Sequence, residues 1–314
     1  MKHALELCSL ALNPSAPAPT ASMVKVEDGF MISYGGTMCI RVPVKYAFGC
    51  TFDPTPMKTF FRKERERIGY TVKASKLTIT EGKEKMTIPV LPPESMPTID
   101  VISPVQDLTV NLHLVRYFST IINPTHQNYS AQGVNFNEGF MLSTNGYAFM
   151  VTPSGLPDGV RFNIHKDVCA ALAKFKSKLV GMAIDTHLVK FCFEDGSSLI
   201  THSIVDMLPL SWMEMVSGDD WVPMNIPEKV VEDLIKIEAD DFGIDEGKVT
   251  YVHIDKKASG ELAVPGAVGP YGTVRPSTLA IILRNGGELC RNRVNGFFRS
   301  VNDDVCVLCS CKVC

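Results

Sequence analysis

Two stretches of this chain decide its fold: VKVEDGFMIS at residues 24–33 and VNFNEGFMLS at residues 134–143. They align without a gap at an offset of 110 positions, and the central Gly-Phe-Met is the same in both. Gly36 and Gly146 coincide at the same offset. An acidic residue followed by glycine between two apolar runs is a strong signal for a β-hairpin. A repeat of this length indicates that one folding unit is used more than once.

Further matches follow in the same order along the chain. Phe52-Asp53 corresponds to Phe162-Asn163, LTITEG at 77–82 to FCFEDG at 191–196, and Met96-Pro97 to Leu208-Pro209. An ungapped run followed by three ordered matches argues against the alternative that any two strand-turn-strand units look alike. We therefore interpret residues 1–216 as two copies of one domain.

Each copy is predicted to contain a helix, two strands, a second helix and two more strands. Apolar residues recur three and four positions apart in the first helices, which is the helical period. Asp53 and Asn163 are predicted to cap the second helices, because their side chains accept hydrogen bonds from free backbone N–H groups. The four predicted helices span residues 4–12, 54–67, 112–122 and 165–175.

Residues 218–314 are predicted to form a shortened third copy. A helix is expected at 227–235, with Pro227 in the first turn, where a missing N–H does no harm. The other expected elements are a hairpin turning at Glu246-Gly247, a loop at 260–272, a second helix at 275–284 and closing strands at 297–313. The sequence thus predicts an α+β protein with domains at 1–104, 105–217 and 218–314.

The composition, with 45% hydrophobic and 21% charged residues, is typical of a globular protein. No apolar run approaches the roughly 18 residues that span a bilayer, and the N-terminal MKHALEL is interpreted as the first helix rather than a signal peptide. Ten cysteines then predict a reducing cytoplasm, where thiols stay free. The net charge of -3 argues against a uniformly basic nucleic-acid binder, but it leaves open a local concentration of Lys and Arg.

Three passages resemble the bacterial DNA polymerase III β subunit, a DNA sliding clamp. They are residues 125–149, with THQNYSAQGV and LSTNGYAF, LITHSIVDMLP at 199–209, and VLCSCKV at 307–313. The resemblance extends over essentially the whole chain. It implies three tandem DNA-clamp domains with helices lining a channel and antiparallel sheets outside. Two protomers would join head to tail in a ring around double-stranded DNA, without reading its sequence.

The resemblance also implies a function in DNA replication. The protein would be a processivity factor, not an enzyme, that needs no cofactor and tethers the replicative polymerase. Polymerase and clamp loader would bind through short apolar peptides. The divergence and the short third domain would fit a phage-encoded clamp acting in the cytoplasm of an infected bacterial cell.

The resemblance places DNA contacts on the helices and on the loop after residue 125. A scattered positive charge suits a protein that slides on DNA, although for any single residue ordinary surface solvation is the simpler interpretation. The family's arginine in the loop after the first helix has no counterpart in NPSAPAP at 13–19. The candidate DNA-binding residues are Lys58, Arg62, Lys63, Arg116, His126, Gln127, Tyr129, Lys166, Lys174, Lys229, Lys236 and Arg284.

The resemblance also implies an apolar cleft for partner peptides between the second and third domains. An apolar concavity with a few polar groups suits a peptide anchor, and methionines suit a surface that accepts several ligands. The alternative is that these are core residues at strand ends. The candidate cleft residues are Ala131, Thr144, Gly146, Tyr147, Ala148, Phe149, Pro209, Met213, Met215, Leu308, Cys309, Ser310, Cys311, Lys312 and Val313.

Metal binding and catalysis are the alternatives to DNA and peptide binding. The C-x2-C-x-C-x2-C run at 306–314 invites zinc, but in an alternating strand its cysteines point to opposite faces, so no metal is predicted. No nucleophile elbow, Walker loop or H-E-x-x-H motif is present, so no catalytic residue is predicted. The competing function is a monomeric clamp-fold processivity protein that binds DNA electrostatically without encircling it.

Overall fold

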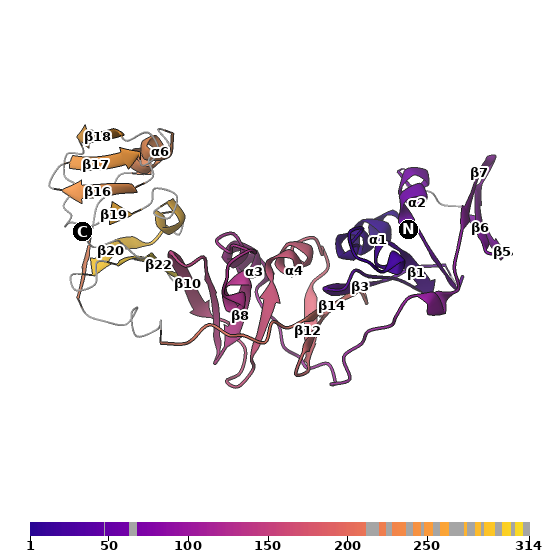
Figure 1. Cartoon of the computed structure of the whole chain (residues 1–314). Helices are drawn as coiled ribbons and strands as arrows, with labels where there is room; N and C mark the ends of the chain where they lie inside the picture. The colour runs from indigo at the N-terminus through magenta and orange to yellow at the C-terminus, as the bar shows by residue number, and fades with distance from the viewer. Residues whose placement is uncertain are drawn as a thin grey trace. The chain divides into compact units, whose positions relative to one another are not determined.

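The computed structural model describes residues 1–46, 48–62, 68–211, 220–223, 228–236, 241–245, 248–253, 258–263, 273–274, 280–283, 286–292, 297–302 and 305–309. The chain forms two compact units (Figure 1). One unit comprises Met1–Arg116 with Ile164–Val205, and the other Tyr117–Asn163 with Asp206–Cys314.

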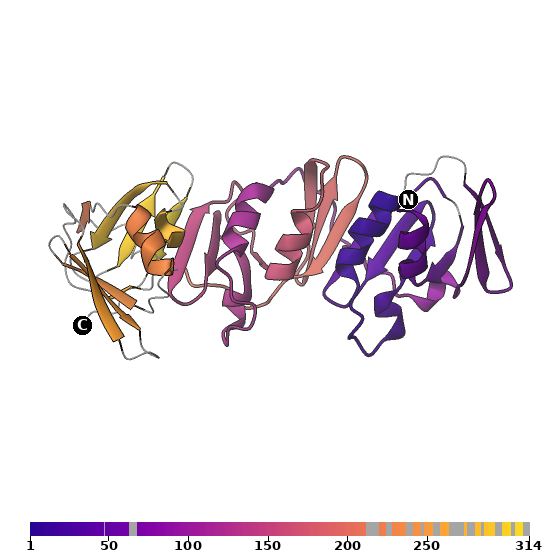
Figure 2. The ribbon, with the colours of Figure 1, turned by 90° about the horizontal axis from the view of Figure 1, so that it is seen from above.

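The first unit contains a seven-stranded antiparallel sheet in the order β12-β13-β14-β3-β2-β1-β4, and a three-stranded sheet in the order β5-β6-β7. Figures 1 and 2 show α1, α2 and α4 on one face of the larger sheet. The helices are α1 (Lys2–Cys8), α2 (Pro54–Phe60) and α4 (Lys166–Leu172), with 3-10 turns η1 (Ser9–Ala11), η2 (Pro19–Ser22) and η3 (Pro93–Ser95). The strands are β1 (Val24–Glu27), β2 (Phe30–Tyr34), β3 (Met38–Pro43), β4 (Cys50–Phe52), β5 (Gly69–Lys73), β6 (Lys76–Glu81), β7 (Glu84–Pro89), β12 (Leu179–Ile184), β13 (Leu188–Phe193) and β14 (Ser198–His202).

The second unit contains an eight-stranded sheet in the order β11-β8-β9-β10-β22-β21-β20-β15, and a four-stranded sheet in the order β18-β17-β16-β19. Two elements, α3 (Leu112–Ser119) and β11 (Phe162–His165), contribute residues to both units. The other elements are η4 (Tyr129–Gln132), β8 (Gly133–Asn137), β9 (Phe140–Thr144), β10 (Ala148–Pro153), β15 (Trp221–Pro223), α6 (Glu228–Lys236), β16 (Asp241–Asp245), β17 (Lys248–His253), β18 (Ala258–Ala263), β19 (Thr273–Val274), β20 (Glu288–Asn292), β21 (Phe298–Val301) and β22 (Cys306–Cys309).

The predicted repeat is reproduced in the register of the hairpins. Val26 pairs with Met31 in the first hairpin, and Phe136 pairs with Met141 in the second. Both residues of each turn have positive φ, 50° and 77° at Asp28-Gly29 against 48° and 79° at Glu138-Gly139. This is the type I′ geometry that matches the twist of paired strands. Residues 24–33 and 134–143 therefore form hairpins with the same register and the same turn type.

The same strand order occurs three times. The first copy has β3-β2-β1-β4, the second β10-β9-β8-β11, and the third β18-β17-β16-β19. The third copy therefore keeps the arrangement of the other two in the part that is described. The predicted loop at 260–272 is wrong at its start, because Gly260 lies in β18 and pairs with Tyr251. Cross-strand pairing overrides the weak strand propensity of glycine there.

Each of the two larger sheets also joins strands of neighbouring copies. Strand β14 pairs with β3, with Ile200 opposite Cys39. Strand β22 pairs with β10, with Leu308 opposite Phe149. Since Cys39 and Phe149 are 110 positions apart, the chain makes the same junction twice.

The segments that follow the closing strands of each copy cover these junctions. Met96 is buried against Ile32, Cys39 and Ile200 in one cluster. Leu208, which corresponds to Met96, is buried against Leu142 and Phe149 in the other.

Polar side chains from β1 and β8 fix the same two segments in place. The buried Lys25 donates to Thr98 Oγ1 at 3.0 Å and pairs with Glu27 at 2.9 Å. At the corresponding position, Asn135 accepts from the Leu208 N–H at 2.9 Å. Buried polar groups of this kind must be paired, so they specify one position for each segment.

The helix predictions were right in place and less so in extent. Apolar residues of α1 pack on β2 and β3, and Cys8 donates its thiol to the Met31 and Ile40 carbonyls. Asp53 caps α2 by accepting from the Thr55 N–H at 2.8 Å. The helices α1, α2, α3 and α4 all end earlier than predicted. Residues 61–62 of the expected second helix form a turn, and residues 63–67 lie outside the described part. Of the helix expected at 275–284, residues 280–283 are described and helical.

The predicted cap Asn163 is wrong. Its side chain is buried and its amide donates to the Ser130 and Asp206 carbonyls at 3.2 and 3.1 Å. His165 caps α4 instead, because its Nδ1 accepts from the Asp167 N–H at 3.3 Å. Asn163 therefore ties the chain before β8 to the segment after β14, which local sequence does not reveal.

Candidate functional site

The turn from Thr144 to Phe149 is the part of the predicted cleft that side-chain hydrogen bonds hold in place. Thr144 Oγ1 donates to the Ala148 carbonyl at 2.7 Å and accepts from the Gly146 N–H at 3.0 Å. Asn145 Oδ1 accepts from the N–H groups of Tyr147 and Ala148 at 2.9 and 2.7 Å. Gly146 has φ +89°, which favours glycine. The turn is thus held by side-chain to backbone bonds, and it presents Tyr147, which is 47% exposed.

Several predicted cleft residues form the wall behind this turn. Ala131, Ala148 and Phe149 are each at most 2% exposed, and Phe149 packs with Leu142, Val151 and Leu208. Their side chains support the surface and offer little area to a ligand.

The strand pairing brings Leu308 and Cys309 opposite Phe149 and Ala148. Pro209 is exposed and follows the buried Leu208. The predicted residues Met213, Met215, Ser310, Cys311, Lys312 and Val313 lie outside the described residues.

Sequence reasoning missed three large apolar residues beside this wall. Phe140, Leu210 and Trp221 are partly buried and pack against the Phe149 cluster. The Arg299 guanidinium lies 4.2 Å from the centre of the Trp221 ring, a cation–π contact. Trp221 is one of two tryptophans in the chain, which was the available signal. An apolar surface with a fixed turn and a half-buried indole is suited to binding a short peptide.

The predicted DNA-binding residues are mostly exposed side chains. Lys58, Arg62, Arg116, Lys174, Lys229 and Lys236 are exposed, and Lys166 is half-buried. Lys236 pairs with Asp233 at 3.2 Å. Lys63 and Arg284 lie outside the described residues. These cations come from α2, α3, α4, α6 and the segments that follow them, as the resemblance implies.

The loop after residue 125 lies against the Thr144–Phe149 turn. A Cβ built on Gly146 would lie 3.1 Å from His126 Nε2, so the imidazole packs on the turn. Nδ1 of His126 accepts from the Asn128 N–H at 3.0 Å, and its carbonyl accepts from the Gln132 amide at 2.8 Å. Gln127 and Tyr129 are exposed. The candidate DNA loop and the candidate peptide turn are therefore neighbours in the second unit.

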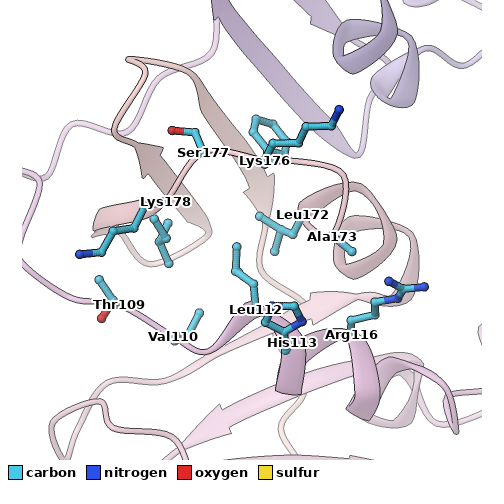
Figure 3. Close-up of a pocket in the computed structure, with 12 residues that line it drawn as sticks. Thr109, Val110, Leu112, His113, Arg116, Leu172, Ala173, Lys176, Ser177 and Lys178 are labelled. Atoms are coloured by element: carbon cyan, nitrogen blue, oxygen red, sulfur yellow. The ribbon is translucent and has the colours of Figure 1, made fainter. Parts of the chain in front are cut away.

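A basic hollow in the first unit was not predicted as a site. It has a volume of about 430 Å³ and lies between the beginning of α3 and the end of α4 (Figure 3). Arg116, His113, Lys176 and Lys178 line it, together with apolar residues.

Among the residues whose side chains are described, seven cysteines are free thiols, and five of them are buried: Cys8, Cys39, Cys50, Cys169 and Cys290. Burial raises the pKa of Cys8 and Cys50 to about 12 and that of Cys39 and Cys306 to about 11. A thiolate is the form that attacks or binds metal, so these thiols are inert near neutral pH. Within the described ranges no group of three His, Cys, Asp or Glu side chains could hold a metal ion. In the same part of the chain no helix is long and apolar enough to cross a membrane.

Comparison of the sequence with known proteins finds no match, whereas comparison of the structure does. No protein-family model matches the sequence, and no curated protein matches it significantly. Solved structures do match over the whole chain. A DnaN sliding clamp (DNA polymerase III subunit beta) from Pseudomonas aeruginosa, bound to griselimycin, matches with a TM-score of 0.80 at 14% identity, covering 100% of this chain and 97% of its own.

The chain has the β sliding clamp fold. A Helicobacter pylori β clamp bound to a DNA ligase peptide matches as well, with a TM-score of 0.77 at 13% identity, covering 99% of this chain and 97% of its own. The predicted fold class is therefore confirmed.

Proposed function

We propose that this protein is a DNA sliding clamp, a processivity factor that encircles duplex DNA and tethers a replicative polymerase. One observation carries the proposal. The junction between neighbouring copies occurs twice within the chain, as β14 with β3 and β22 with β10. Each junction joins the closing strand of one copy to a strand of the copy before it. Within one chain the first copy has no copy before it and the third has no copy after it, so one strand at each end is left to make a third junction. Two chains joined head to tail would complete it on both sides and close a ring of six domains.

The two unfilled halves can be named. Strand β7 corresponds to β14 and β22, and in the described sheets it is an edge strand of β5-β6-β7. Strand β18 corresponds to β3 and β10, and it is an edge strand of the described β18-β17-β16-β19 sheet. An exposed edge is a ready template for pairing with another chain. We propose that β7 of one protomer pairs antiparallel with β18 of its partner, and that the three domains are 1–104, 105–217 and 218–314.

Binding of DNA would rest on the helix faces. Sequence-independent binding needs phosphate contacts rather than base contacts, and the exposed cations of the helical segments meet this need. A net charge of -3 for the whole chain is compatible with a positive inner face and a negative outer one.

Partner binding would use the Thr144–Phe149 turn with Tyr147, Pro209 and the β22 strand. The H. pylori β clamp that shares this fold binds a DNA ligase peptide. The ordered turn and the partly buried Trp221 and Leu210 provide an apolar surface in this chain. A polymerase and a loader would each insert a short apolar peptide there.

The test is retention on circular DNA. A clamp loaded on a nicked circle should stay bound through gel filtration at high salt, and it should leave when one cut makes the circle linear. A protein that only binds electrostatically would be lost from both forms at high salt. Equal loss from circular and linear DNA, with a monomeric mass, would contradict the proposal and favour the monomeric processivity protein.

A further inference from the structure

The basic hollow of the first unit has an apolar floor and a cationic rim. Val110, Leu172, Phe175 and Leu179 line it and are all at most 8% exposed. Figure 3 shows Arg116, Lys176 and Lys178 around it on different sides. We call this feature the α3–α4 hollow.

The segment KFKSK at 174–178 presents its lysines in a fixed way. Phe175 is buried and stacks on Phe193, with ring centres 4.2 Å apart and planes 8° apart. The Lys178 carbonyl accepts from the Glu194 N–H at 2.9 Å, and Ser177 Oγ accepts from the Asp195 N–H at 3.1 Å. Because the backbone is anchored at these three points, the exposed Lys174, Lys176 and Lys178 project from a rigid support.

The hollow has one sign of charge. Its lining includes Arg116, Lys176, Lys178 and His113, and no Asp or Glu is among the described residues that line it. The corresponding end of the second helix in the first copy reads RKERER at 62–67, with four basic and two acidic residues. Apolar walls focus the field of the cations, since they are less polarisable than water. The second copy thus carries its basic residues there without the acidic residues that accompany them in the first copy.

We propose that the α3–α4 hollow seats a backbone phosphate of the threaded duplex, with Lys176 and Lys178 as its main contacts. The inference rests on the proposed clamp function and adds residues to the DNA-binding set. Charge complementarity favours a polyanion. The hollow is built from the helical segments that supply the other candidate DNA contacts, and the loop at 13–19 has no cation to share this role. An acidic peptide is the alternative occupant, and it is made an outcome of the test.

The first experiment compares Lys176→Ala/Lys178→Ala with Lys45→Ala/Lys73→Ala in the full chain. The control removes two exposed lysines from outside the helical segments. Affinity for a 20-base-pair duplex is measured by fluorescence anisotropy from about 50 to 200 mM salt. The plot of log affinity against log salt has a negative slope, and each lost phosphate contact makes it shallower by about 0.9. The hollow variant should therefore lose about 2 from the slope and bind about tenfold more weakly at low salt, while the control keeps the wild-type values.

The second experiment needs no substitution and reads the lysines directly. The wild-type chain is acetylated with and without the duplex, and modification at each lysine is measured by mass spectrometry. DNA should protect Lys176 and Lys178 and leave Lys45 and Lys73 reactive. Protection by an acidic Glu-Leu peptide and not by the duplex would overturn the proposal and make the hollow a protein-docking site.

The outcomes separate this inference from the function on which it rests. A wild-type chain retained on circular DNA, together with an unchanged salt slope in the hollow variant, overturns the inference alone. A wild-type chain that is not retained and shows no salt-dependent affinity overturns the proposed function and this inference with it.

Discussion

Gly146→Ala should damage the turn that is proposed to bind partner peptides, and its repeat counterpart Gly36→Ala provides the matched control. Both glycines are exposed and have positive φ, +89° and +100°. An alanine forced into such a conformation costs about 1–2 kcal/mol at either position. A Cβ at Gly36 would meet no heavy atom within 4 Å, whereas one at Gly146 would lie 3.1 Å from His126 Nε2.

The difference between the two variants isolates the His126 contact. The imidazole must shift by a few tenths of an ångström, which weakens its 3.0 Å hydrogen bond from the Asn128 N–H. Losing such a bond costs about 1 kcal/mol. Gly146→Ala should therefore destabilise the chain by about 2–3 kcal/mol, about 1 kcal/mol more than Gly36→Ala.

Two assays check this reasoning. Urea denaturation gives the free energy of unfolding for both variants. Anisotropy with a labelled copy of the DNA ligase peptide bound by the H. pylori β clamp gives the partner affinity. A displaced turn should weaken binding about fivefold to tenfold in Gly146→Ala only, as expected for about 1 kcal/mol. Equal peptide affinities for the two variants would refute the role assigned to the turn.

Three further predictions concern stability. Glu27→Gln should lower the free energy of unfolding by about 2–3 kcal/mol, because it leaves the buried Lys25 without its counter-ion. Glu94→Gln, at an exposed position, should change it by less than about 0.5 kcal/mol. Equal losses in the two variants would rule out a stabilising role of the Lys25–Glu27 pair. Burial raises the pKa of Asp100, but hydrogen bonds from Lys190 and the Val101 N–H outweigh it, so the net pKa is lowered. The ionised Asp100 therefore stabilises the fold above its unfolded-state pKa, and this stabilisation is lost as pH falls through its folded-state pKa. Asp100→Asn should make the free energy of unfolding fall less steeply below about pH 4 than in the wild type, and an unchanged pH dependence would argue against this. Burial raises the pKa of Cys8 to about 12. The buried neutral thiol therefore stabilises the fold fully below about pH 8.5, and this stabilisation is lost as pH rises toward 12. The urea midpoint of the wild type should fall between pH 8 and 10 and that of Cys8→Ala should fall less steeply, and parallel pH profiles of the two midpoints would count against this.

Much of the fold could be predicted because local sequence specifies it. Asp28-Gly29 and Glu138-Gly139 set both hairpins, since few other residue pairs accept positive φ at two successive positions. The Asp53 cap was predictable for a similar reason, as it bonds only two residues along the chain. Such features depend only on residues that are adjacent in the chain, so they can be predicted from the amino-acid sequence alone.

What the sequence did not reveal depends on distant partners. Asn163 was predicted as a cap from its neighbours, but its amide bonds a carbonyl 43 residues away. Lys25 reads as a surface lysine until Thr98, 73 residues on, is placed beside it. The α3–α4 hollow likewise joins residues near 110 with residues near 176, so its single charge sign appeared only in three dimensions. The cleft was predicted by resemblance, and its residues divide into an exposed turn and a buried wall that no local pattern distinguishes.

The closure of two chains into a ring is tested most directly by solution mass. Sedimentation equilibrium at micromolar protein, without DNA, should give about twice the 34.5 kDa of the chain, because β7 and β18 of each protomer then pair with those of the other. A mass of one chain that persists as concentration rises would contradict the account.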